Sequence, residues 1–357
     1  MSGASRGVGP AAVRAALAAA EPAYAGAVRV RNALYDRGWR RVVRLGRPTV
    51  SVGNVTAGGT GKTPMVIELC RRLAGDGAGS PCRPAVLMRG YGGDESREVA
   101  ETLGDAAAME VNVDRAAAAR AVLRRDPRVG VFVLDDGFQH RRVHRDLDLV
   151  LVDATQPFGY NHVLPRGLLR EPVAGLRRAS AVIVTRAEAV SDVHLAALDE
   201  RIEAITSRPA AAHAAYEWAA LRDGDEQRSV ADLAGRRVAG VCGVGNPAAF
   251  ERALRQAVGE HGSVVFCAAG ADHQAYTREA VRGLGARARA AGAELVVTTG
   301  KDWVKWRDTL GGEPAPLPVW RAEVAVRFVR GEAAVDAMLA GVVARDGSEA
   351  GGSGGVG

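Results

Sequence analysis

The sequence predicts an α/β protein in which a parallel sheet is covered by helices on both faces, with a second, smaller α/β domain after it. Short apolar runs occur near residues 84, 129, 147 and 181, and helix-like stretches separate them. Strands that are apolar on both faces and spaced by helices are typical of a parallel sheet buried between helical layers. A second set of apolar runs begins near residue 238, and 357 residues exceed one ordinary core, which favours two domains.

The positive charge of the chain is concentrated before the first predicted strand. Seven arginines and one acid, Asp36, lie between Arg29 and Arg47, and the whole chain has a net charge of +6. On a helix over residues 30–45, one half would carry Leu34, Tyr35, Trp39, Val42 and Val43, and the other half Arg37, Arg40, Arg41 and Arg44. We expect this helix either to bind an anionic membrane surface or to pack its apolar half on its own domain.

The first predicted strand leads into a glycine-rich loop. Residues 49–64 read T-V-S-V-G-N-V-T-A-G-G-T-G-K-T-P. A triphosphate needs many backbone N–H donors directed at one small volume, and glycines allow a chain to fold that tightly. The pattern predicts a P-loop NTPase-like domain whose nucleotide-binding residues are Thr56, Ala57, Gly58, Gly59, Thr60, Gly61, Lys62 and Thr63.

Within this loop, we expect Lys62 to reach the β- and γ-phosphates and Thr63 to offer its hydroxyl to Mg²⁺. Pro64 suits the first turn of a helix whose N-terminus faces the anion. The loop lacks the first glycine of the G-x-x-x-x-G-K-[ST] pattern, because Thr56 stands there. A chance glycine-rich turn is the alternative, and the strand before the loop and the helical pattern after it argue against that alternative.

Two adjacent acids close the predicted strand near residue 129. The run V-F-V-L ends in Asp135 and Asp136, which is the place of a Walker-B acid that holds Mg²⁺ directly or through water. Ligands of open α/β sheets gather at the carboxyl ends of strands, so these acids are the expected metal ligands, although one of them could be a structural cap. His140 and His144 lack a third partner at a suitable spacing, which argues against a zinc site.

Composition excludes several other classes of protein. The four cysteines lie far apart with no C-x-x-C, which argues against a zinc knuckle or a disulfide framework and indicates a reducing cytosol. No apolar run approaches the about 18 residues that a membrane span requires. No basic groove interleaved with aromatic residues follows the arginine-rich segment, so nucleic-acid binding is not expected.

Six sequence blocks follow one another along the chain: G-N-V-T-A-G-G-T-G-K-T-P at 53, R-G-Y-G-G at 89, D-D-G-F-Q-H-R at 135, L-P-R-G-L-L-R-E-P at 164, C-G-V-G-N-P at 242 and D-H-Q-A-Y-T at 272. Together and in this order, they resemble the tetraacyldisaccharide 4′-kinases of lipid A biosynthesis. The resemblance extends over residues 28–305, and Thr56 fits it because the P-loop of that family also lacks the first glycine.

The resemblance implies a kinase that uses ATP and Mg²⁺ to phosphorylate the 4′-hydroxyl of a tetraacyl lipid A disaccharide 1-phosphate, which gives lipid IVA. It also implies a peripheral enzyme on the cytoplasmic face of the bacterial inner membrane, attached through residues 30–45. No nucleic acid and no protein partner are expected.

The resemblance also implies the catalytic residues. Asp94, in the fused block R-G-Y-G-G-D-E-S, matches the carboxylate that orients the acceptor hydroxyl, and His273 is expected to orient Asp94, with Lys62 on the phosphates. In the family a spacer separates the two halves of this block, so the fusion indicates a deleted surface loop. The family's T-E-K-D block appears as T-G-K-D, with Gly300 in place of the glutamate.

Further site residues are carried over from the same blocks. Glu171 is expected in the metal site beside Asp135 and Asp136. The candidates for binding substrate or stabilising charge are Arg115, Gln139 and His140.

Two other classes of P-loop protein are alternatives. One is an ATPase of the partition or dethiobiotin-synthetase type that acts on a protein partner or a small acid. The other is a GTPase, but the segment from Thr299 to Asp302 is only a loose version of the N-K-x-D guanine-binding motif.

The predicted domain organisation follows from these observations and from the polar stretch L-R-D-G-D-E-Q-R-S near residue 221. We expect a basic helical region over 1–47, a P-loop kinase domain over 48–230, a smaller α/β domain over 235–345 and a disordered, glycine-rich tail over 346–357.

Overall fold

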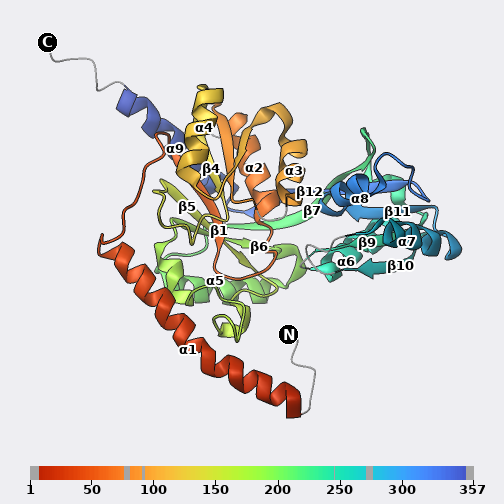
Figure 1. Cartoon of the computed structure of the whole chain (residues 1–357), viewed down its shortest axis with the longest axis horizontal. Coiled ribbons are helices and arrows are strands. Elements are labelled where there is room, and N and C mark those ends of the chain that lie inside the picture. The colour runs from red at the N-terminus through yellow and green to blue at the C-terminus, as the bar shows by residue number, and fades with distance from the viewer. Residues whose placement is uncertain (1–7, 76–80, 91–92, 245, 271–275, 351–357) are drawn as a thin grey trace. The chain divides into compact units, whose positions relative to one another are not determined.

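The computed structural model describes residues 8–75, 81–90, 93–244, 246–270 and 276–350 of the chain (Figure 1). Contacts between residues divide the chain into two compact units. Unit 1 comprises Met1–Arg89, Asp105–Ala215 and Phe328–Gly357, and unit 2 comprises Gly90–Gly104 and Tyr216–Arg327. Both units contain strands and helices.

Unit 1 is built on a parallel sheet. Its strands, in spatial order, are the first part of β7 (Ala212–Asp223), β6 (Ala181–Thr185), β5 (Leu147–Asp153), β1 (Thr49–Asn54), β4 (Val129–Asp135), β2 (Arg83–Met88) and β3 (Ala108–Val111). Every neighbouring pair in this order is parallel. The predicted parallel sheet is therefore confirmed, and β3 and β7 have no counterpart among the expected strands.

The helices of unit 1 pack on this sheet through buried apolar residues. They are α1 (Val8–Asp36), α2 (Lys62–Ala74), α4 (Arg115–Arg125), α5 (Asp192–Thr206) and α9 (Glu332–Ala350), with short 3₁₀ turns at Gly159–Asn161, Val173–Arg178 and Ala187–Ala189. Ala25 of α1 and Leu198 of α5 share one buried cluster with Val150 of β5. Val122 of α4 shares another with Phe132 of β4. Figure 1 accordingly shows α1 along the α5 side of this unit.

Unit 2 holds the second α/β sheet. Its strands, in spatial order, are β10 (Ser263–Ala269), β9 (Arg237–Cys242), β11 (Leu295–Thr299), β12 (Val319–Arg330) and the rest of β7, which pairs with the short β8 (Glu226–Arg228). Its helices are α3 (Asp94–Leu103), α6 (Pro247–Val258), α7 (Arg278–Ala290) and α8 (Gly300–Leu310). Val238 of β9 packs with Leu254 of α6, and the next residue, Ala239, packs with Trp306 of α8. Helices therefore cover both faces of this sheet as well.

The contact units differ from the expected domains 48–230 and 235–345 in three segments. Residues 216–230, expected in the kinase domain, belong to unit 2. Helix α3 lies between two strands of unit 1 in the sequence, yet it belongs to unit 2. Helix α9 follows the last strand of unit 2, yet it belongs to unit 1. The chain therefore passes between the contact units several times, and the expected domain bounds stay predictions.

The helix expected over residues 30–45 is wrong beyond Asp36, where α1 ends. Gly38 has a φ of +72°, and the N–H groups of Gly38 and Trp39 donate to the carbonyls of Tyr35 and Leu34. These two bonds form a Schellman motif, which ends a helix at a glycine in the left-handed region. Residues 37–47 then run as a connector in which Val43 pairs with Val143. The apolar and basic residues of this segment consequently do not form the two halves of one helix.

The C-terminal region also differs from expectation. Helix α9 reaches Ala350, so residues 346–350 of the expected disordered tail are helical. The remaining residues of that tail lie outside the described part of the chain. Among the described helices, none combines the length and the apolar character that crossing a bilayer requires.

Candidate active site

The P-loop has the conformation that its glycines predict. β1 ends at Asn54, and α2 begins at Lys62 with Pro64 in its first turn. Gly58 and Gly61 have φ angles of +116° and +82°, which is left-handed backbone that residues with a Cβ rarely adopt. An added Cβ at Gly58 would meet no atom within 4 Å, so this glycine is required by the backbone conformation and not by crowding.

The loop is held in place by the segment L-P-R-G-L-L-R-E-P. The N–H of Arg170 donates to the carbonyl of Val55 at 2.7 Å, and the N–H of Ala57 donates to the carbonyl of Leu168 at 2.6 Å. Between these two bonds, Thr56 forms an antiparallel bridge with Leu169. This short ladder fixes the first half of the loop. Thr56, which pairs with Leu169 in it, occupies the position of the first glycine in the Walker-A pattern.

The second half of the loop is held by the ends of β5 and β6. The Thr185 hydroxyl donates to the carbonyl of Thr60 at 3.2 Å. Arg186 donates to the carbonyl of Gly59 at 2.7 Å and forms an ion pair with Asp153. The carbonyls of Gly59 and Thr60 therefore accept hydrogen bonds from side chains at the edge of the sheet.

Lys62 and Asp136 form the charged centre of the site. The Lys62 ammonium donates to Asn54 Oδ1 at 3.3 Å and lies 3.6 Å from Asp136 Oδ1. Arg170 approaches both oxygens of Asp136 at 2.7 Å. Burial raises the pKa of Asp136, but the charges of Lys62 and Arg170 outweigh burial, so this pKa lies below its ordinary value. Asp136 is thus a carboxylate at neutral pH.

Asp135 and Arg115 lie beside this centre. Asp135 is buried, and its carbonyl accepts a hydrogen bond from Arg115 at 3.0 Å. A second nitrogen of Arg115 donates to the carbonyl of Asn112 at 2.8 Å. Burial lowers the pKa of Arg115 to about 10, which still leaves it charged at neutral pH. Arg115 therefore supplies a fixed positive charge at the carboxyl ends of the strands.

Gln139 and Glu171 connect the strand end to the P-loop. The Gln139 amide donates to the carbonyl of Asn54 at 2.8 Å and to Glu171 Oε1 at 2.9 Å. Glu171 is fully buried, and its other oxygen accepts bonds from Arg178 at 2.8 Å and from Asn32 of α1 at 3.2 Å. The carboxylate is compensated on both sides, which is what a buried charge requires.

His140 follows Gln139 in the same turn. Burial, and then the charges of Arg115 and Arg89, lower the pKa of His140. Its imidazole is therefore neutral at neutral pH and able to donate and to accept a hydrogen bond.

The expected metal ligands do not gather as a set of three. Among the residues that the structure describes, no three acidic, histidine or cysteine side chains lie close enough to hold a metal ion. Thr63 is the second residue of α2. Mg²⁺ in phosphoryl-transfer enzymes takes one or two carboxylates and completes its shell with phosphate and water, so the residues present fit such a site without a three-carboxylate cage. The roles of Thr63, Asp135, Asp136 and Glu171 on the metal stay predictions.

Asp94 is the first residue of α3, after Gly93 with a φ of +73°. The next residue, Glu95, accepts a hydrogen bond from Lys301 of α8 at 3.2 Å. An added Cβ at Gly300 would lie 2.8 Å from Glu98 Oε1, so the missing side chain of T-G-K-D makes room for α3. His273 lies outside the described residues, and its pairing with Asp94 stays a prediction.

Several residues of this site were not expected from the sequence. Asn54 and Arg170 stand inside the P-loop and L-P-R-G-L-L-R-E-P blocks, so a signal for them was present. Asn32 and Arg178 lie outside every block and join the site only through the fold.

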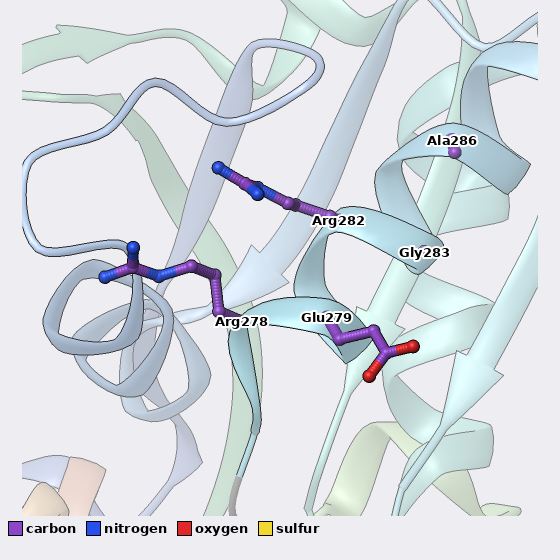
Figure 2. Close-up of a pocket in the computed structure, with 5 residues that line it drawn as sticks. All are labelled: Arg278, Glu279, Arg282, Gly283 and Ala286. Carbon is purple, nitrogen blue, oxygen red and sulfur yellow. The ribbon is translucent and has the colours of Figure 1, made fainter.

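A surface hollow on α7 is not a comparable site. Arg278, Glu279, Arg282, Gly283 and Ala286 line it. Arg278 and Arg282 both form ion pairs with Glu313. Figure 2 shows these residues on one helix, with Glu279 directed away from the two arginines. The hollow offers no convergent set of polar groups.

Comparison with known proteins identifies the family. The family model of tetraacyldisaccharide-1-P 4′-kinase matches residues 13–344. The chain belongs to this family. The tetraacyldisaccharide 4′-kinase of Anaeromyxobacter sp. (strain K) is 39% identical over 355 residues, which is 91% of each chain. The Geobacter metallireducens kinase is 40% identical over 320 residues, 82% of this chain and 88% of the relative.

A solved structure agrees with this assignment. LpxK from Aquifex aeolicus, crystallised in complex with ATP, matches with a TM-score of 0.70 and 26% identity, over 93% of this chain and 99% of that chain. The predicted membership in the tetraacyldisaccharide 4′-kinases is confirmed, and so is the predicted class of enzyme, a phosphotransferase. The matches do not support the alternative ATPase that acts on a protein partner or a small acid.

Proposed function

We propose that this protein transfers the γ-phosphoryl group of ATP to the 4′-hydroxyl of a tetraacyl disaccharide 1-phosphate in lipid A biosynthesis, which yields lipid IVA. The observation that carries the proposal is the P-loop itself, with left-handed Gly58 and Gly61 ahead of Lys62 at the start of α2. Backbone N–H groups at a helix N-terminus favour phosphate oxygens. The ATP complex of LpxK from Aquifex aeolicus, which matches this fold, supports the same nucleotide.

Phosphoryl transfer passes through a loose transition state, so the protein contributes alignment and compensation of charge. Lys62 is placed to contact the β- and γ-phosphates, because it begins the helix that follows the loop. In doing so it leaves Asp136, whose carboxylate Arg170 still holds at 2.7 Å. Arg115 adds a further positive charge near the strand ends.

Thr63 and the acids Asp135 and Asp136 are the residues that would hold Mg²⁺, with Glu171 and Gln139 behind them. Mg²⁺ held by these residues would neutralise part of the negative charge of the phosphate groups during transfer. The acidic residues present fit this role because Asp136 is ionised at neutral pH and partly exposed.

Asp94 is the proposed group that orients the acceptor hydroxyl and takes its proton late in the transfer. The match of R-G-Y-G-G-D-E-S to the family's block supports this role. Within unit 2, Asp94 begins α3, a helix fixed to α8 by the ion pair of Glu95 with Lys301 at 3.2 Å. His273 is the proposed partner that orients the carboxylate.

The proposed membrane contact lies around the end of α1. Val30, Trp39 and Val42 have exposed fractions of 62%, 73% and 46%, although each is apolar. The exposed arginines among them are Arg29, Arg37, Arg40, Arg41 and Arg44. Apolar side chains beside guanidinium groups suit the interface of an anionic bilayer, where the acyl region and the phosphates lie close together. We therefore propose that the protein attaches peripherally to a membrane, and its resemblance to the lipid A kinases favours the cytoplasmic face of the inner membrane.

The test is direct. Purified protein is incubated with ATP, Mg²⁺ and a tetraacyl disaccharide 1-phosphate in detergent, and the lipid is analysed by mass spectrometry. The expected product carries one additional phosphate on the 4′ position, and Lys62→Ala protein yields almost none. ATP hydrolysis without any phosphorylated lipid would contradict the proposal and return attention to an ATPase.

A further inference from the structure

One face of α1 contacts the P-loop unit directly. Glu21 accepts a hydrogen bond from the N–H of Val163 at 3.2 Å, and the Tyr24 hydroxyl donates to the carbonyl of Arg170 at 2.9 Å. Asn32 donates to Glu171 Oε2 at 3.2 Å. These residues, with the buried Ala25 and Val28, recur every three or four positions, which places them on one side of the helix. Figure 1 shows α1 lying along this unit.

Asn32 has a defined orientation in this contact. Its Oδ1 accepts a hydrogen bond from Arg31 at 3.2 Å, which leaves the Nδ2 group as the donor to Glu171. Arg141 donates to the carbonyl of Asn32 at 2.9 Å and binds Asp36 at 2.6 Å, so the backbone around Asn32 is fixed as well. The side chain is therefore held as a donor aimed at a buried carboxylate.

Glu171 has little freedom of its own. It is fully buried, and a Cβ added at Gly175 would lie 2.5 Å from Oε2, so this oxygen occupies a closely filled space. Asn32 and Arg178 both bind Oε2, which leaves Oε1 directed at Gln139. The pair of donors on one oxygen thus determines where the other oxygen points.

Oε1 is the oxygen that faces the site. Gln139, which binds it, also donates to the carbonyl of Asn54. The side-chain oxygen of Asn54 in turn accepts a hydrogen bond from the ammonium of Lys62. A chain of hydrogen bonds therefore runs from α1 through Glu171 and Gln139 to the P-loop lysine.

We propose that Asn32 is a positioning residue for phosphoryl transfer: it fixes the rotation of the Glu171 carboxylate, and through it Gln139, toward the bound nucleotide and its Mg²⁺. α1 then contributes to the active site in addition to any contact with lipid. The inference rests on the proposed function, because it assigns Asn32 to the same reaction.

The experiment uses the full-length protein and three substitutions of Asn32. Asn32→Ala removes the donor, Asn32→Ser keeps a shorter donor, and Asn32→Asp keeps the size but replaces the donor with a carboxylate. Ala27→Ser, on the exposed side of the same helix, is the control. Kinetics in detergent, affinity for a fluorescent ATP analogue with and without Mg²⁺, and thermal unfolding are measured for each variant.

We expect Asn32→Ala to lower kcat by about 10- to 100-fold, the range found for residues that orient ligands of a metal site. The KM for the lipid should stay unchanged and Asn32→Ser should recover part of kcat. The Mg²⁺-dependent gain in nucleotide affinity should fall, while the affinity without metal should not.

Comparison of Asn32→Ser with Asn32→Asp separates positioning from packing. Both variants keep a polar side chain, but only the serine hydroxyl can donate to Glu171, because a carboxylate has no proton to donate. We expect Asn32→Ser to recover part of kcat and Asn32→Asp to stay as low as Asn32→Ala. In a purely structural defect, kcat would follow the unfolding temperature of the variants and not the presence of a donor.

Two outcomes overturn the inference. One is an Asn32→Ala protein with kcat and KM within twofold of the unmodified protein. The other is a loss of activity that is explained by a lowered unfolding temperature and that Asn32→Ser does not restore. If the unmodified protein phosphorylates no disaccharide, the proposed function fails. The inference is then decided by the Mg²⁺-dependent nucleotide affinity alone, and equal values for Asn32→Ala and the unmodified protein overturn it.

Discussion

The ammonium of Lys62 lies 3.6 Å from a carboxylate oxygen of Asp136, and the same carboxylate is bound on its other side by Arg170. The P-loop lysine therefore has a charge partner within the protein before any phosphate arrives. If Lys62 contacts the phosphates as we propose, binding a nucleotide would exchange this partner for phosphate oxygens, and Arg170 would keep Asp136 compensated.

Removing the lysine tests its place on the phosphates. In Lys62→Ala, we expect kcat to fall by about 10²- to 10³-fold or more, because a preorganised cation at the transferring group is lost. Asp136 retains Arg170, so the folded state should survive. Steady-state kinetics with a circular dichroism control would decide the matter, and a near-normal kcat would remove Lys62 from the mechanism.

The lowered pKa of Asp136 makes a prediction about acid stability. A carboxyl group has a pKa near 3.9 in the unfolded chain, about that of a free aspartate. Since the folded value is lower, the stabilisation is complete above about pH 4 and is lost as the pH falls through the folded pKa.

The predicted loss of stability in acid is checked with urea unfolding at several pH values. The free energy of unfolding is measured for the unmodified protein and for Asp136→Asn. Their difference should be constant between pH 5 and 8 and should shrink below about pH 4. A difference that grows on acidification would mean that the charges of Lys62 and Arg170 do not act on this group.

Gly175 gives a prediction about packing around Glu171. In Gly175→Ala, the new Cβ would lie 2.5 Å from Glu171 Oε2 and 2.9 Å from its Cδ, so the buried carboxylate must move. We expect a loss of about 1–3 kcal/mol in the free energy of unfolding. Gly26→Ala in α1 is the matched control, because its Cβ would meet nothing within 4 Å. Equal urea midpoints for the two variants would contradict the geometry at Glu171.

Membrane attachment is tested by charge reversal. Arg37 and Arg41 are exposed beside Trp39. Because each basic residue near an anionic surface contributes about 1 kcal/mol, Arg37→Glu with Arg41→Glu should release the protein from anionic vesicles at low salt. Turnover of a short, soluble substrate analogue should be spared. The double reversal Arg255→Glu with Arg282→Glu, on helices α6 and α7 of unit 2, alters net charge equally and should leave sedimentation with vesicles nearly unchanged.

The last prediction concerns the residues proposed to act on the hydroxyl group that receives the phosphoryl group. If Asp94 positions the hydroxyl and His273 orients Asp94, the two substitutions to alanine should not be additive in kcat. Asp94→Ala alone should lower kcat by about 10²- to 10⁴-fold, His273→Ala by less, and the double variant by little more than Asp94→Ala. KM for ATP should hardly change. Independent, multiplicative effects would refute the dyad, and an ordinary kcat in Asp94→Ala would shift attention to Glu95.

The sequence was most informative where a structural feature depends on neighbouring residues. Gly58, Gly61 and Lys62 specify the P-loop within a few positions, and short, mostly apolar runs specify β2, β4, β5 and β6. The residue that ends α1, Gly38, is also a local signal. It was overlooked because the arginines and apolar residues around it fit a helical pattern.

Other features depend on residues far apart in the chain. Asn32 reaches Glu171 across 139 positions, and no periodicity within α1 indicates which side chain it meets. The assignment of α3 to unit 2 has the same origin, since its partners Lys301, Arg307 and Arg321 all lie some 200 positions away. Such pairings are properties of the folded chain and become visible only in three dimensions.

The return of α9 to unit 1 has a practical consequence for dissecting the protein. Arg72 of α2 binds Glu332 and Asp336 of α9 at 2.5 and 2.7 Å, and its guanidinium lies 4.9 Å from the centre of the Phe328 ring. Expressing residues 1–215 alone would therefore discard the helix that neutralises Arg72, and expressing 216–327 alone would discard α3. A soluble fragment of either unit requires joining distant stretches with new linkers, so no single cut or proteolytic clip can separate the two units intact.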